Sequence, residues 1–502
     1  MRKFFQTHQR LISIIAPIFI TIVFLCLSCL NLNSSIWFDE AFSSYLIRGN
    51  FADIWQLTAL DVHPPFFYFC LKIWSLIFGT SVLALRFMSV FFGGLSLILI
   101  FHLAKQCFGL RPAVFATFFM SLSPVFIRLA QEMRMYTLVL FIVTSATFVL
   151  IKALQSKKRH YWIIYAILVS LGMWTHYFTS LAWLTHLIFI YKQQGSLKKF
   201  LRQKAAILSY LLSVLFYLPW LPFFLKQFNN VQRAFWIPGI SLKTPIDFIS
   251  DSLFLQSSEK ITNWIAILAT ATVAAIIFLA IKIWPKIATK QRFYAKFLAF
   301  LVALPPLLLL LLSLPPLRPM FVDRYASYSS ILIWLTLGLI IFAAFEYKIS
   351  KLPLRIISLV FVLAVAGVGI FNVTTREPKG HVQDIFTAVT QDSDDSSPIL
   401  AATEWIYYDA AAYSSTNHPV HYVSEWSKYQ YGSLEPIRRY KYNLTEHYAD
   451  FLKSQDSFWY ITETPKDQKP KLPAKTEGFL VTKQISNPHH TAIKLERNKN
   501  TP

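Results

Sequence analysis

Four side chains capable of acid–base chemistry lie in one short polar stretch after the first long apolar run of the sequence. Asp39 and Glu40 are adjacent in "WFDEAFSS", and Asp61 and His63 stand two residues apart in "DVHPPFFY". A carboxylate beside hydrocarbon costs free energy, so acidic residues in such places are expected to have a function. An apolar boundary also raises the basicity of a carboxylate, which enables it to take a proton from a hydroxyl group. This stretch is the first candidate site.

Further polar groups stand at the ends of later apolar runs, in "RLAQEMRMY", "THYF" and "FVDRY". The candidates among them are Glu132, Arg134, Tyr136, His176 and Arg324. Arginine stays charged at any pH, and its planar fork of donors matches phosphate oxygens. A carboxylate base and a cationic clamp are what is needed to move a group from a lipid phosphate to a hydroxyl. The phosphate would be the leaving group, its charge stabilised by preorganised donors.

The composition is that of a chain that crosses a membrane many times. Of its 502 residues, 55% are hydrophobic and 15% are charged, whereas a soluble protein carries about 25% charged residues. Apolar runs of membrane-spanning length recur along most of the chain. The formal net charge of +22 comes largely from Lys and Arg in the short loops between these runs. That pattern sets membrane orientation and does not predict nucleic-acid binding.

We predict eleven membrane-spanning helices. They cover Leu11–Leu32, Val82–Lys105, Pro112–Ile127, Met133–Leu154, Tyr161–Thr175, Phe178–Tyr191, Lys204–Pro222, Ile261–Trp284, Tyr294–Leu314, Tyr325–Glu346 and Leu354–Phe371. The apolar segment Pro65–Phe78 is too short to cross and is predicted to be a partial or interfacial helix. Counting it as a crossing would invert every later loop and break the pattern of loop charges.

The loop charges predict a multi-pass protein of the plasma membrane with a cytoplasmic N-terminus. An odd number of crossings then places the segment after Phe371 outside. The expected fold is a polytopic α-helical membrane domain over residues 1–373, whose first outer loop (33–81) carries the acidic motifs, followed by a small extracytoplasmic α/β domain over residues 374–502. In that outer domain "SPILAAT", "HPVHYVS", "SFWYIT" and "GFLVTK" are predicted strands, and "ERNKNTP" is expected to be frayed.

This topology places all the candidate residues on one side. The first outer loop holds Asp39, Glu40, Asp61 and His63, and three later outer turns hold Glu132, Arg134, Tyr136, His176 and Arg324. Structural polar groups would not be expected to favour one side so strongly. The sequence therefore predicts an outward-facing site at the membrane surface.

Five motifs in this order resemble the protein mannosyltransferase-like family of GT-C glycosyltransferases, which includes polyprenyl-phosphate-mannose-protein mannosyltransferases and ArnT-like enzymes. They are "WFDEAFSS", "DVHPPFFYFCLKIWSLIFGTSVLALR", "QEMRMYTLVLF", "THYF" and "LPWLPFFLKQ". The resemblance covers about Met1–Tyr325. It implies a polyprenyl-phosphate sugar donor and inverting transfer on the outer face. It also implies that Asp39 and Glu40 are catalytic and that Arg324 contacts phosphate.

We therefore expect a membrane glycosyltransferase, transferring a hexose or a pentose. Besides Arg324, the residues expected to bind substrate are Asp61, His63, Glu132, Arg134, Tyr136 and His176. The C-terminal segment shows no clear resemblance to the β-trefoil repeats of eukaryotic protein mannosyltransferases, so the acceptor class (protein, lipid or glycan) stays open. The alternative function is a transporter or flippase of lipid-linked sugars. Transporters, however, place charged groups near the membrane midplane and often have repeated halves, and no repeat is visible here.

The same residues also have structural interpretations. Asp39 has the position of a helix cap. Glu132 and Arg134 are close enough in sequence to form an ion pair, and so are Asp323 and Arg324. Asp61 and His63 offer two ligands for a divalent metal, but a closed site needs more and no third ligand is evident. We predict no other cofactor.

Overall fold

A computed structural model of the chain describes residues 8–156, 158–233, 237–255, 263–349, 351–375, 379–391, 396–414, 418–426, 435–440, 444–470, 472–473 and 476–498. Contacts divide the chain into two compact units. The first unit comprises Met1–Leu32 and Arg86–Arg376, and the second comprises Asn33–Leu85 and Glu377–Pro502. The first outer loop therefore belongs to the same compact unit as the C-terminal segment. The predicted boundary between residues 373 and 374 separates the membrane-spanning part of the chain from the extracytoplasmic part, and it stays a prediction.

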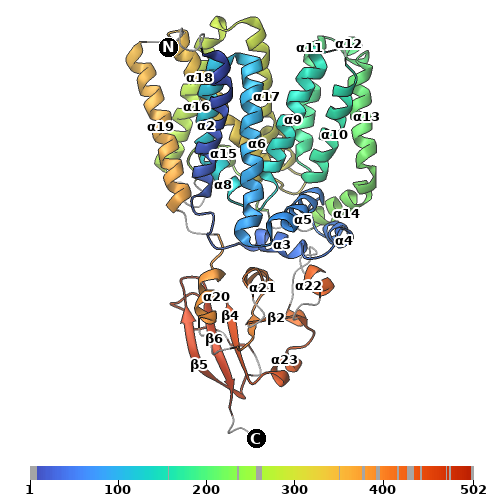
Figure 1. Ribbon diagram of the computed structural model, residues 1–502, viewed down its shortest axis with the longest axis vertical. Coiled ribbons are helices and arrows are strands. Elements are labelled where there is room, and N and C mark those ends of the chain that lie inside the picture. Colours follow the sequence, from blue (N-terminus) through green and yellow to red (C-terminus); the bar gives the residue numbers. More distant parts are fainter. Residues whose placement is uncertain are drawn as a thin grey trace. The chain divides into compact units, whose positions relative to one another are not determined.

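The first unit consists of apolar helices (Figure 1), because a helix satisfies the backbone hydrogen bonds of an apolar run within the run itself. The long helices are α2 (Gln9–Cys29), α6 (Val82–Phe108), α7 (Leu110–Ser121), α9 (Tyr136–Gln155), α10 (His160–Thr175), α11 (Thr179–Gln194), α13 (Lys204–Tyr217), α16 (Asn263–Ile283), α17 (Thr289–Leu312), α18 (Ser327–Glu346) and α19 (Leu352–Thr375). Shorter elements are α8 (Pro124–Ala130), α12 (Leu197–Leu201), η1 (Leu218–Trp220), α14 (Leu221–Arg233), α15 (Thr244–Phe254), η3 (Trp284–Lys286) and η4 (Asp323–Ala326).

Each of the eleven predicted spans corresponds to a helix of this unit. Within the described part of the chain, eight helices are long and apolar enough to cross a membrane, and a bent pair makes up to nine. Helices α10 and α11 have 16 residues each, which agrees with the short spans predicted there. The span predicted from Ile261 begins at Asn263, and residues 261 and 262 lie outside the described residues. A polytopic helical membrane protein is thus confirmed.

The span predicted as one helix over Pro112–Ile127 is broken in the structure. Helix α7 ends at Ser121 and α8 begins at Pro124, with a bend of 63° between them. The hydroxyl of Ser123 accepts a hydrogen bond from the backbone N–H of Phe126 at 3.3 Å, and Pro124 occupies the first helical position. Serine as N-cap followed by proline is a helix start signal. The prediction of a single helix was wrong because a new helix begins inside the apolar run.

Two glycines allow close approach of helices in this unit. A Cβ atom at Gly338 of α18 would lie 2.6 Å from Cα of Ala116 in α7, and one at Gly369 of α19 would lie 2.0 Å from Cγ of Pro124 in α8. Any larger residue would force these helices apart. Helices α7 and α8 are therefore held between neighbours that come much later in the chain.

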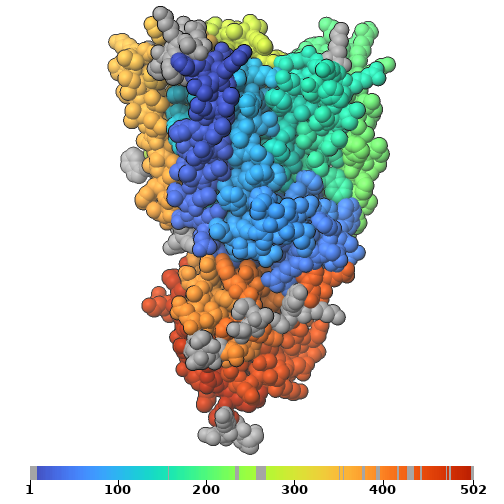
Figure 2. All heavy atoms as spheres, viewed as in Figure 1, coloured from blue at the N-terminus to red at the C-terminus, as the bar shows by residue number. Residues whose placement is uncertain are grey.

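The outer surface of the first unit is apolar. Ile14, Ile18 and Ile22 of α2 and Ile357 and Val360 of α19 are all about half exposed, and both helices lie at the surface of this unit in Figure 2, in dark blue and light orange. A soluble monomer seldom exposes so many large apolar side chains together. A lipid bilayer is the solvent that suits this surface.

The second unit begins with three short helices from the first outer loop. They are α3 (Phe38–Leu46), α4 (Phe51–Leu60) and α5 (Phe66–Phe78). Helix α4 begins with a capping box, in which Asn50 and Asp53 each bind the other's backbone N–H, a strong local start signal. Helix α5 has 13 residues and matches the short helix predicted over Pro65–Phe78.

The rest of the second unit is built around a six-stranded sheet of strand order β3-β2-β1-β4-β6-β5. The strands are β1 (Ile399–Ala401), β2 (Val420–Val423), β3 (Leu444–Thr445), β4 (Ser457–Thr462), β5 (Phe479–Ser486) and β6 (Thr491–Arg497). Strands β1 to β4 are parallel to one another, and β6 is antiparallel to both β4 and β5. The predicted α/β domain is confirmed.

Two strands, β3 and β6, were missed by the sequence analysis. Strand β6 runs to Arg497, and Glu496 pairs with Ser457 of β4. The expectation that "ERNKNTP" is frayed was therefore wrong for its first two residues, whereas residues 499–502 lie outside the described part of the chain. Pairing along the whole length of β4 orders the end of β6, although the polar composition of this segment did not predict a strand.

Helices cover both faces of the sheet. Helix α21 (Glu404–Ala411) packs on one face, where the ring of Tyr407 lies 6.1 Å from that of Tyr422. Helix α23 (Tyr448–Ser454) packs on the other face, where Phe451 lies 5.3 Å from His421. Adjacent strand residues point to opposite faces, so His421 and Tyr422 of β2 mark the two layers. Two further α-helices, α20 (Val382–Thr390) and α22 (Glu435–Tyr440), and the 3₁₀ turn η5 (Ser424–Trp426) complete the described helices of this unit.

Candidate active site

The acidic pair lies in the first turn of α3. Trp37 is the N-cap residue of this helix, and its side chain makes no capping hydrogen bond, so Asp39 is not the N-cap residue itself. Asp39 and Glu40 occupy helical positions, where the N-terminal dipole of the helix favours negative charge. Glu40 is fully buried, whereas Asp39 is only partly buried. The two neighbours therefore differ in access, and Asp39 is the one that a substrate can reach.

The "DVHPP" segment forms the turn between α4 and α5. Asp61 is the C-cap residue of α4, and Pro65 is the N-cap residue of α5. Nδ1 of His63 lies 3.2 Å from Oδ2 of Asp61, and both side chains are largely buried. The two prolines fix the backbone here, so the imidazole and the carboxylate are held as a rigid pair.

Helix α21 of the C-terminal segment packs directly against α3, within the second unit. The ring of Phe38 lies 4.1 Å from that of Trp405 and 5.7 Å from that of Tyr408. The hydroxyls of Tyr45 and Tyr407 are hydrogen bonded at 2.9 Å. Tyr408 is fully buried, and Asp61 is among the charged groups that act on its hydroxyl. Tyr408 thus packs against the acidic helix α3 and lies within electrostatic range of Asp61.

Other contacts hold α3 and α4 in place. Nη2 of Arg48 donates to the carbonyl of Ala411 at 2.8 Å, and the hydroxyl of Tyr440 in α22 donates to the carbonyl of Leu46 at 2.9 Å. Arg439 pairs with Asp53 of α4 at 2.9 Å. The segment predicted as the first outer loop is therefore fixed by the C-terminal segment at several points, as a preorganised site requires.

Asp409 brings a third carboxyl group to the acidic pair. Its side chain is 7% exposed, and its Oδ1 atom has no hydrogen-bond partner. Burial raises the pKa of Asp409 well above its ordinary value, and the nearby carboxylates of Glu40, Glu463 and Asp39 raise it further. Glu463 itself accepts a hydrogen bond from Thr403, the N-cap residue of α21. The surroundings of Asp409 therefore favour its neutral form over its ionised form.

The first unit gathers the later candidate residues. Glu132 and Arg134 are buried in the turn between α8 and α9. The ring of Tyr136 lies 6.2 Å from that of His176, which in turn lies 5.3 Å from that of Tyr325. Three turns far apart in sequence thus meet, and η4 places Arg324 next to Tyr325 in this group.

Sequence analysis missed an ion pair in this group. Nη2 of Arg128 in α8 lies 3.6 Å from Oδ2 of Asp251 in α15, and both side chains are largely buried. Glu132, Asp323 and Arg324 are close enough to act on the charge of Arg128. Asp251 lies among apolar residues in the segment after α14. An acidic residue in such surroundings was the only feature of the sequence that could have indicated this ion pair. Several charges at low exposure in a membrane protein indicate a functional region.

The predicted site residues thus fall into two groups. Asp39, Glu40, Asp61 and His63 come together in the second unit with Tyr408 and Asp409, which the sequence analysis did not single out. The group in the first unit consists of Glu132, Arg134, Tyr136, His176 and Arg324, with the additional pair Arg128 and Asp251.

A metal site at Asp61 and His63 would need a third ligand, and none is grouped with them among the residues described. Among the residues that the structure describes, no three or more His, Cys, Asp or Glu side chains are grouped so that they could hold a metal ion. The hydrogen bond between Asp61 and His63 accounts for their proximity. We assign no step to a metal.

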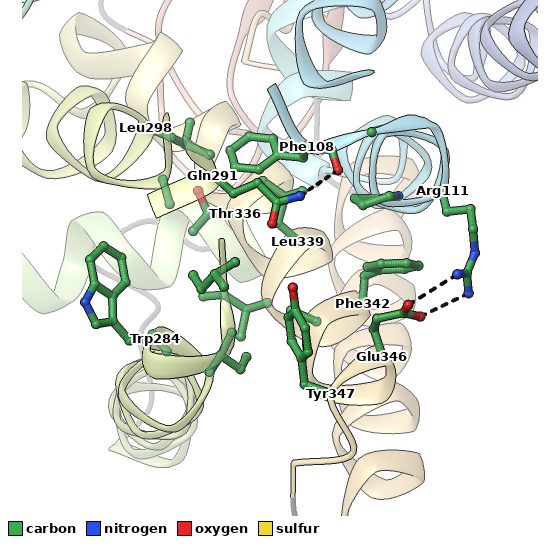
Figure 3. Close-up of a pocket in the computed structure, with 18 of the residues that line it drawn as sticks. Phe108, Arg111, Trp284, Gln291, Leu298, Thr336, Leu339, Phe342, Glu346 and Tyr347 are labelled. Carbon is green, nitrogen blue, oxygen red and sulfur yellow. Dashed lines mark hydrogen bonds and ion pairs between the residues drawn. The ribbon is translucent and has the colours of Figure 1, made fainter. Parts of the chain in front are cut away.

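A large apolar cavity lies in the first unit away from these polar turns (Figure 3). It has a volume of about 590 Å³ and lies where α7 begins and α18 ends, between α16, α17 and α18. Arg111 and Glu346 form an ion pair of 3.2 Å beside it, and Gln291 donates to the carbonyl of Phe108 at 3.2 Å. Because α18 spans the bundle, its start at Ser327 near the polar group and its end at Glu346 near the cavity are at opposite ends. The cavity is therefore not part of the candidate site.

Comparison with known proteins supports the resemblance. Residues 62–223 match the family model described as dolichyl-phosphate-mannose-protein mannosyltransferase. None of the curated proteins matches the sequence. The solved structure of ArnT from Cupriavidus metallidurans bound to undecaprenyl phosphate is similar over 96% of this chain and 97% of that chain, with a TM-score of 0.60 and 11% identity.

The apo state of the same ArnT gives a TM-score of 0.58 at 11% identity, over 94% of this chain and 96% of that chain. The Archaeoglobus fulgidus oligosaccharyltransferase tethered to an acceptor peptide gives 0.53 at 13% identity, over 92% of this chain and 70% of that chain. The chain therefore has a GT-C fold, and its resemblance to protein mannosyltransferase-like and ArnT-like glycosyltransferases is confirmed.

The raised pKa of Asp409 predicts a pH-dependent stability. A carboxyl group whose pKa is raised by folding stabilises the protein at low pH, and this contribution is lost as pH rises toward the folded-state pKa. Replacing Asp409 by Asn removes that loss, so the variant should melt at a higher temperature than wild type, by a margin that grows from about pH 4 to pH 8. Thermal unfolding of the purified full-length protein at several pH values measures this. Asp384→Asn, at an exposed position of α20, is the control. A variant less stable than wild type throughout would show that Asp409 is a paired carboxylate.

The pair of Arg128 and Asp251 predicts an asymmetric response to mutation. Arg128→Gln leaves several buried carboxylates without their cation and should lower the free energy of unfolding by about 3–5 kcal/mol. Asp251→Asn should cost less, because Glu132 and Asp323 still face Arg128. Denaturant unfolding in micelles measures both variants. Arg111→Gln is the matched control, since its more exposed pair with Glu346 should contribute about 1 kcal/mol or less. Equal effects of Arg128→Gln and the control would refute the role of Arg128.

Proposed function

We propose that the protein is a membrane glycosyltransferase that moves a monosaccharide from a polyprenyl-phosphate donor to a hydroxyl group of its acceptor, with inversion at the anomeric carbon. The observation that carries this proposal is the acidic pair in the first turn of α3, with Glu40 buried and Asp39 accessible. A position like this suits a general base. The GT-C fold and the family match over residues 62–223 support the same reaction class.

In the proposed reaction Asp39 is the general base. Its carboxylate takes the proton of the acceptor hydroxyl, and the hydroxyl oxygen attacks the anomeric carbon of the donor sugar. The bond between that carbon and the phosphate oxygen breaks, so the polyprenyl phosphate leaves with the electron pair. Glu40, buried beside Asp39, helps to form the acidic site. The attack from the face opposite the phosphate gives inversion.

The phosphate is assigned to cationic groups. Arg324 is proposed to stabilise the charge that develops on the leaving phosphate, because a guanidinium fork fits phosphate oxygens. Glu132, Arg134, Tyr136 and His176 are proposed to line the substrate site of the first unit, and Asp61 and His63 that of the second. ArnT from Cupriavidus metallidurans was solved with undecaprenyl phosphate bound, which supports a lipid phosphate as donor.

We also propose an orientation in the plasma membrane. Basic residues cluster between α11 and α13, between α16 and the first turns of α17, and before α19, among them Lys198, Lys199, Arg202, Lys286, Arg292 and Lys351. The positive-inside rule places such loops in the cytoplasm. The N-terminus is then cytoplasmic and the sheet of the second unit is outside, where a donor in the outer leaflet meets an exported acceptor.

Replacement of Asp39 by Asn tests the base directly. The amide cannot accept the proton, so sugar transfer should fall by about 10²–10⁴-fold while the melting temperature stays near that of wild type. Transfer is measured in membranes supplied with a panel of labelled polyprenyl-phosphate sugars, and the productive donor identifies the sugar. Asp384→Asn, outside the site, should transfer as wild type does. Full activity of Asp39→Asn would refute the assignment.

Arg324 variants test the phosphate contact. Arg324→Gln removes the charge and should lower the transfer rate by about 10²-fold or more. Arg324→Lys keeps the charge but loses the two-pronged geometry, so its rate should lie between those of Arg324→Gln and wild type. Rates at saturating and at limiting donor separate binding from the chemical step. Equal rates for wild type and both variants would show that Arg324 does not contact the phosphate.

A further inference from the structure

The second unit contains a pocket that the reaction proposed above does not use. It has a volume of about 650 Å³ and lies in the C-terminal segment. Six of its lining residues carry aromatic or polar groups, and they are Glu425, Trp426, His447, Tyr448, Tyr460 and Thr462. All six are among the described residues. The pocket is thus built from a few side chains of distinct chemistry.

The pocket lies where open α/β sheets bind ligands. Its lining includes Ala402 directly after β1, Trp426 shortly after β2 and Thr462 at the end of β4. These strands are parallel, so all three residues stand at the same edge, the carboxyl edge. Strand β1 lies between β2 and β4. The chain therefore adds β2 on one side of β1 and later adds β4 on the other side. The crevice at such a switch point is the usual ligand site of this architecture.

Aromatic rings form one wall of the pocket. The ring of Trp426 lies 4.9 Å from that of Tyr448 and 6.5 Å from that of Tyr460. Tyr448 of α23 and Tyr460 of β4 are buried in the hydrophobic core, while Trp426 is only partly buried and packs against them. The two buried tyrosines hold the partly exposed indole of Trp426 in place. Its apolar ring face can therefore pack against a flat face of a ligand.

Polar groups stand beside this wall. The hydroxyl of Tyr448 is buried and has no hydrogen-bond partner, which is unusual because buried polar groups are nearly always satisfied. The side chains of Tyr460 and Thr462 are hydrogen bonded to each other. The carboxylate of Glu425 accepts a hydrogen bond from the backbone N–H of Tyr448 at 3.0 Å and lies 3.4 Å from Nδ1 of His447. The pocket therefore offers both donors and acceptors in fixed positions.

The charge of the lining narrows the class of ligand. None of the described residues that line the pocket is Lys or Arg, and Glu425 brings a negative charge. Phosphates and other anions are disfavoured there. A purely apolar ligand would leave the hydroxyl of Tyr448 unsatisfied. A neutral ring with one apolar face and several hydroxyl groups fits both the aromatic wall and the polar groups.

We propose that this pocket is a saccharide-binding site that takes a neutral pyranose ring of the acceptor, so that the acceptor is a glycan. The ring packs on Trp426, and its hydroxyl groups bind the Tyr448 hydroxyl, Thr462 and Glu425. The acceptor role rests on the proposed function, whereas saccharide binding itself does not. The site is distinct from Asp39 and Glu40, which do not line the pocket.

The test is a binding measurement with neutral oligosaccharides of mannose, glucose, galactose and N-acetylglucosamine. The full-length protein is held in phospholipid nanodiscs, because the headgroups of maltoside detergents are themselves saccharides. We expect wild type to bind at least one of these oligosaccharides. Trp426→Ala and Tyr448→Phe should each weaken that binding by about tenfold or more, equivalent to about 1.4 kcal/mol. Trp426→Tyr keeps an aromatic platform and should retain most of the binding.

Controls separate this proposal from loss of fold and from the proposed reaction. Tyr448→Phe removes only a hydroxyl without an internal partner, so its melting temperature should equal that of wild type. Tyr347→Phe, in the first unit, is the matched control and should bind as wild type does. Asp39→Asn should lose transfer and keep saccharide binding. If Asp39→Asn transfers sugar at the full rate, the proposed reaction fails while the pocket stands. Absence of binding by folded wild type, or unchanged binding by Trp426→Ala and Tyr448→Phe, would overturn the saccharide site.

Discussion

The packing of α21 against α3 is the interaction on which the acidic site depends. Aromatic rings of Phe38, Trp405 and Tyr408 exclude water around the first turn of α3, and Glu40 is fully buried as a result. A buried carboxylate is costly unless other groups compensate it. The helix N-terminus favours negative charge at this turn, and the raised pKa of Asp409 disfavours a further like charge beside it. The C-terminal segment therefore contributes directly to the candidate site.

The membrane imposes the second constraint, which acts on the first unit. Backbone groups in lipid must be satisfied within helices, so charged side chains are confined to turns and helix ends. Arg128 lies just beyond the bend between α7 and α8, and Arg324 lies in the 3₁₀ turn η4 before α18. Interruptions of the helices thus create the places at which this unit holds its charges. The 63° bend after Ser121 is one of these interruptions.

The sequence predicts what is local and fails where distant segments meet. Spanning helices could be predicted because an apolar run determines its own hydrogen bonding. The break at Ser123–Pro124 carried a local signal that was overlooked because the apolar run continues through it. By contrast, no local pattern could place Asp409 beside Glu40 or Asp251 beside Arg128, since those contacts arise from packing. Strand β6 was missed because its polar end is ordered only by its pairing with β4. The types of the site residues could be chosen from sequence, but not their partners.

The raised pKa of Asp409 bears on the surroundings of the acidic pair. Burial raises that pKa, because an enclosed carboxyl loses most by ionising, and Asp409 has no hydrogen-bond partner on Oδ1 to compensate it. The nearby carboxylates of Glu40, Glu463 and Asp39 raise it further, since like charges disfavour ionisation. Environments that separate the pKa values of neighbouring acids are a recurrent way to assign their chemical roles. On this reasoning the surroundings of the proposed base Asp39 depend on α21 as much as on the motif that contains it.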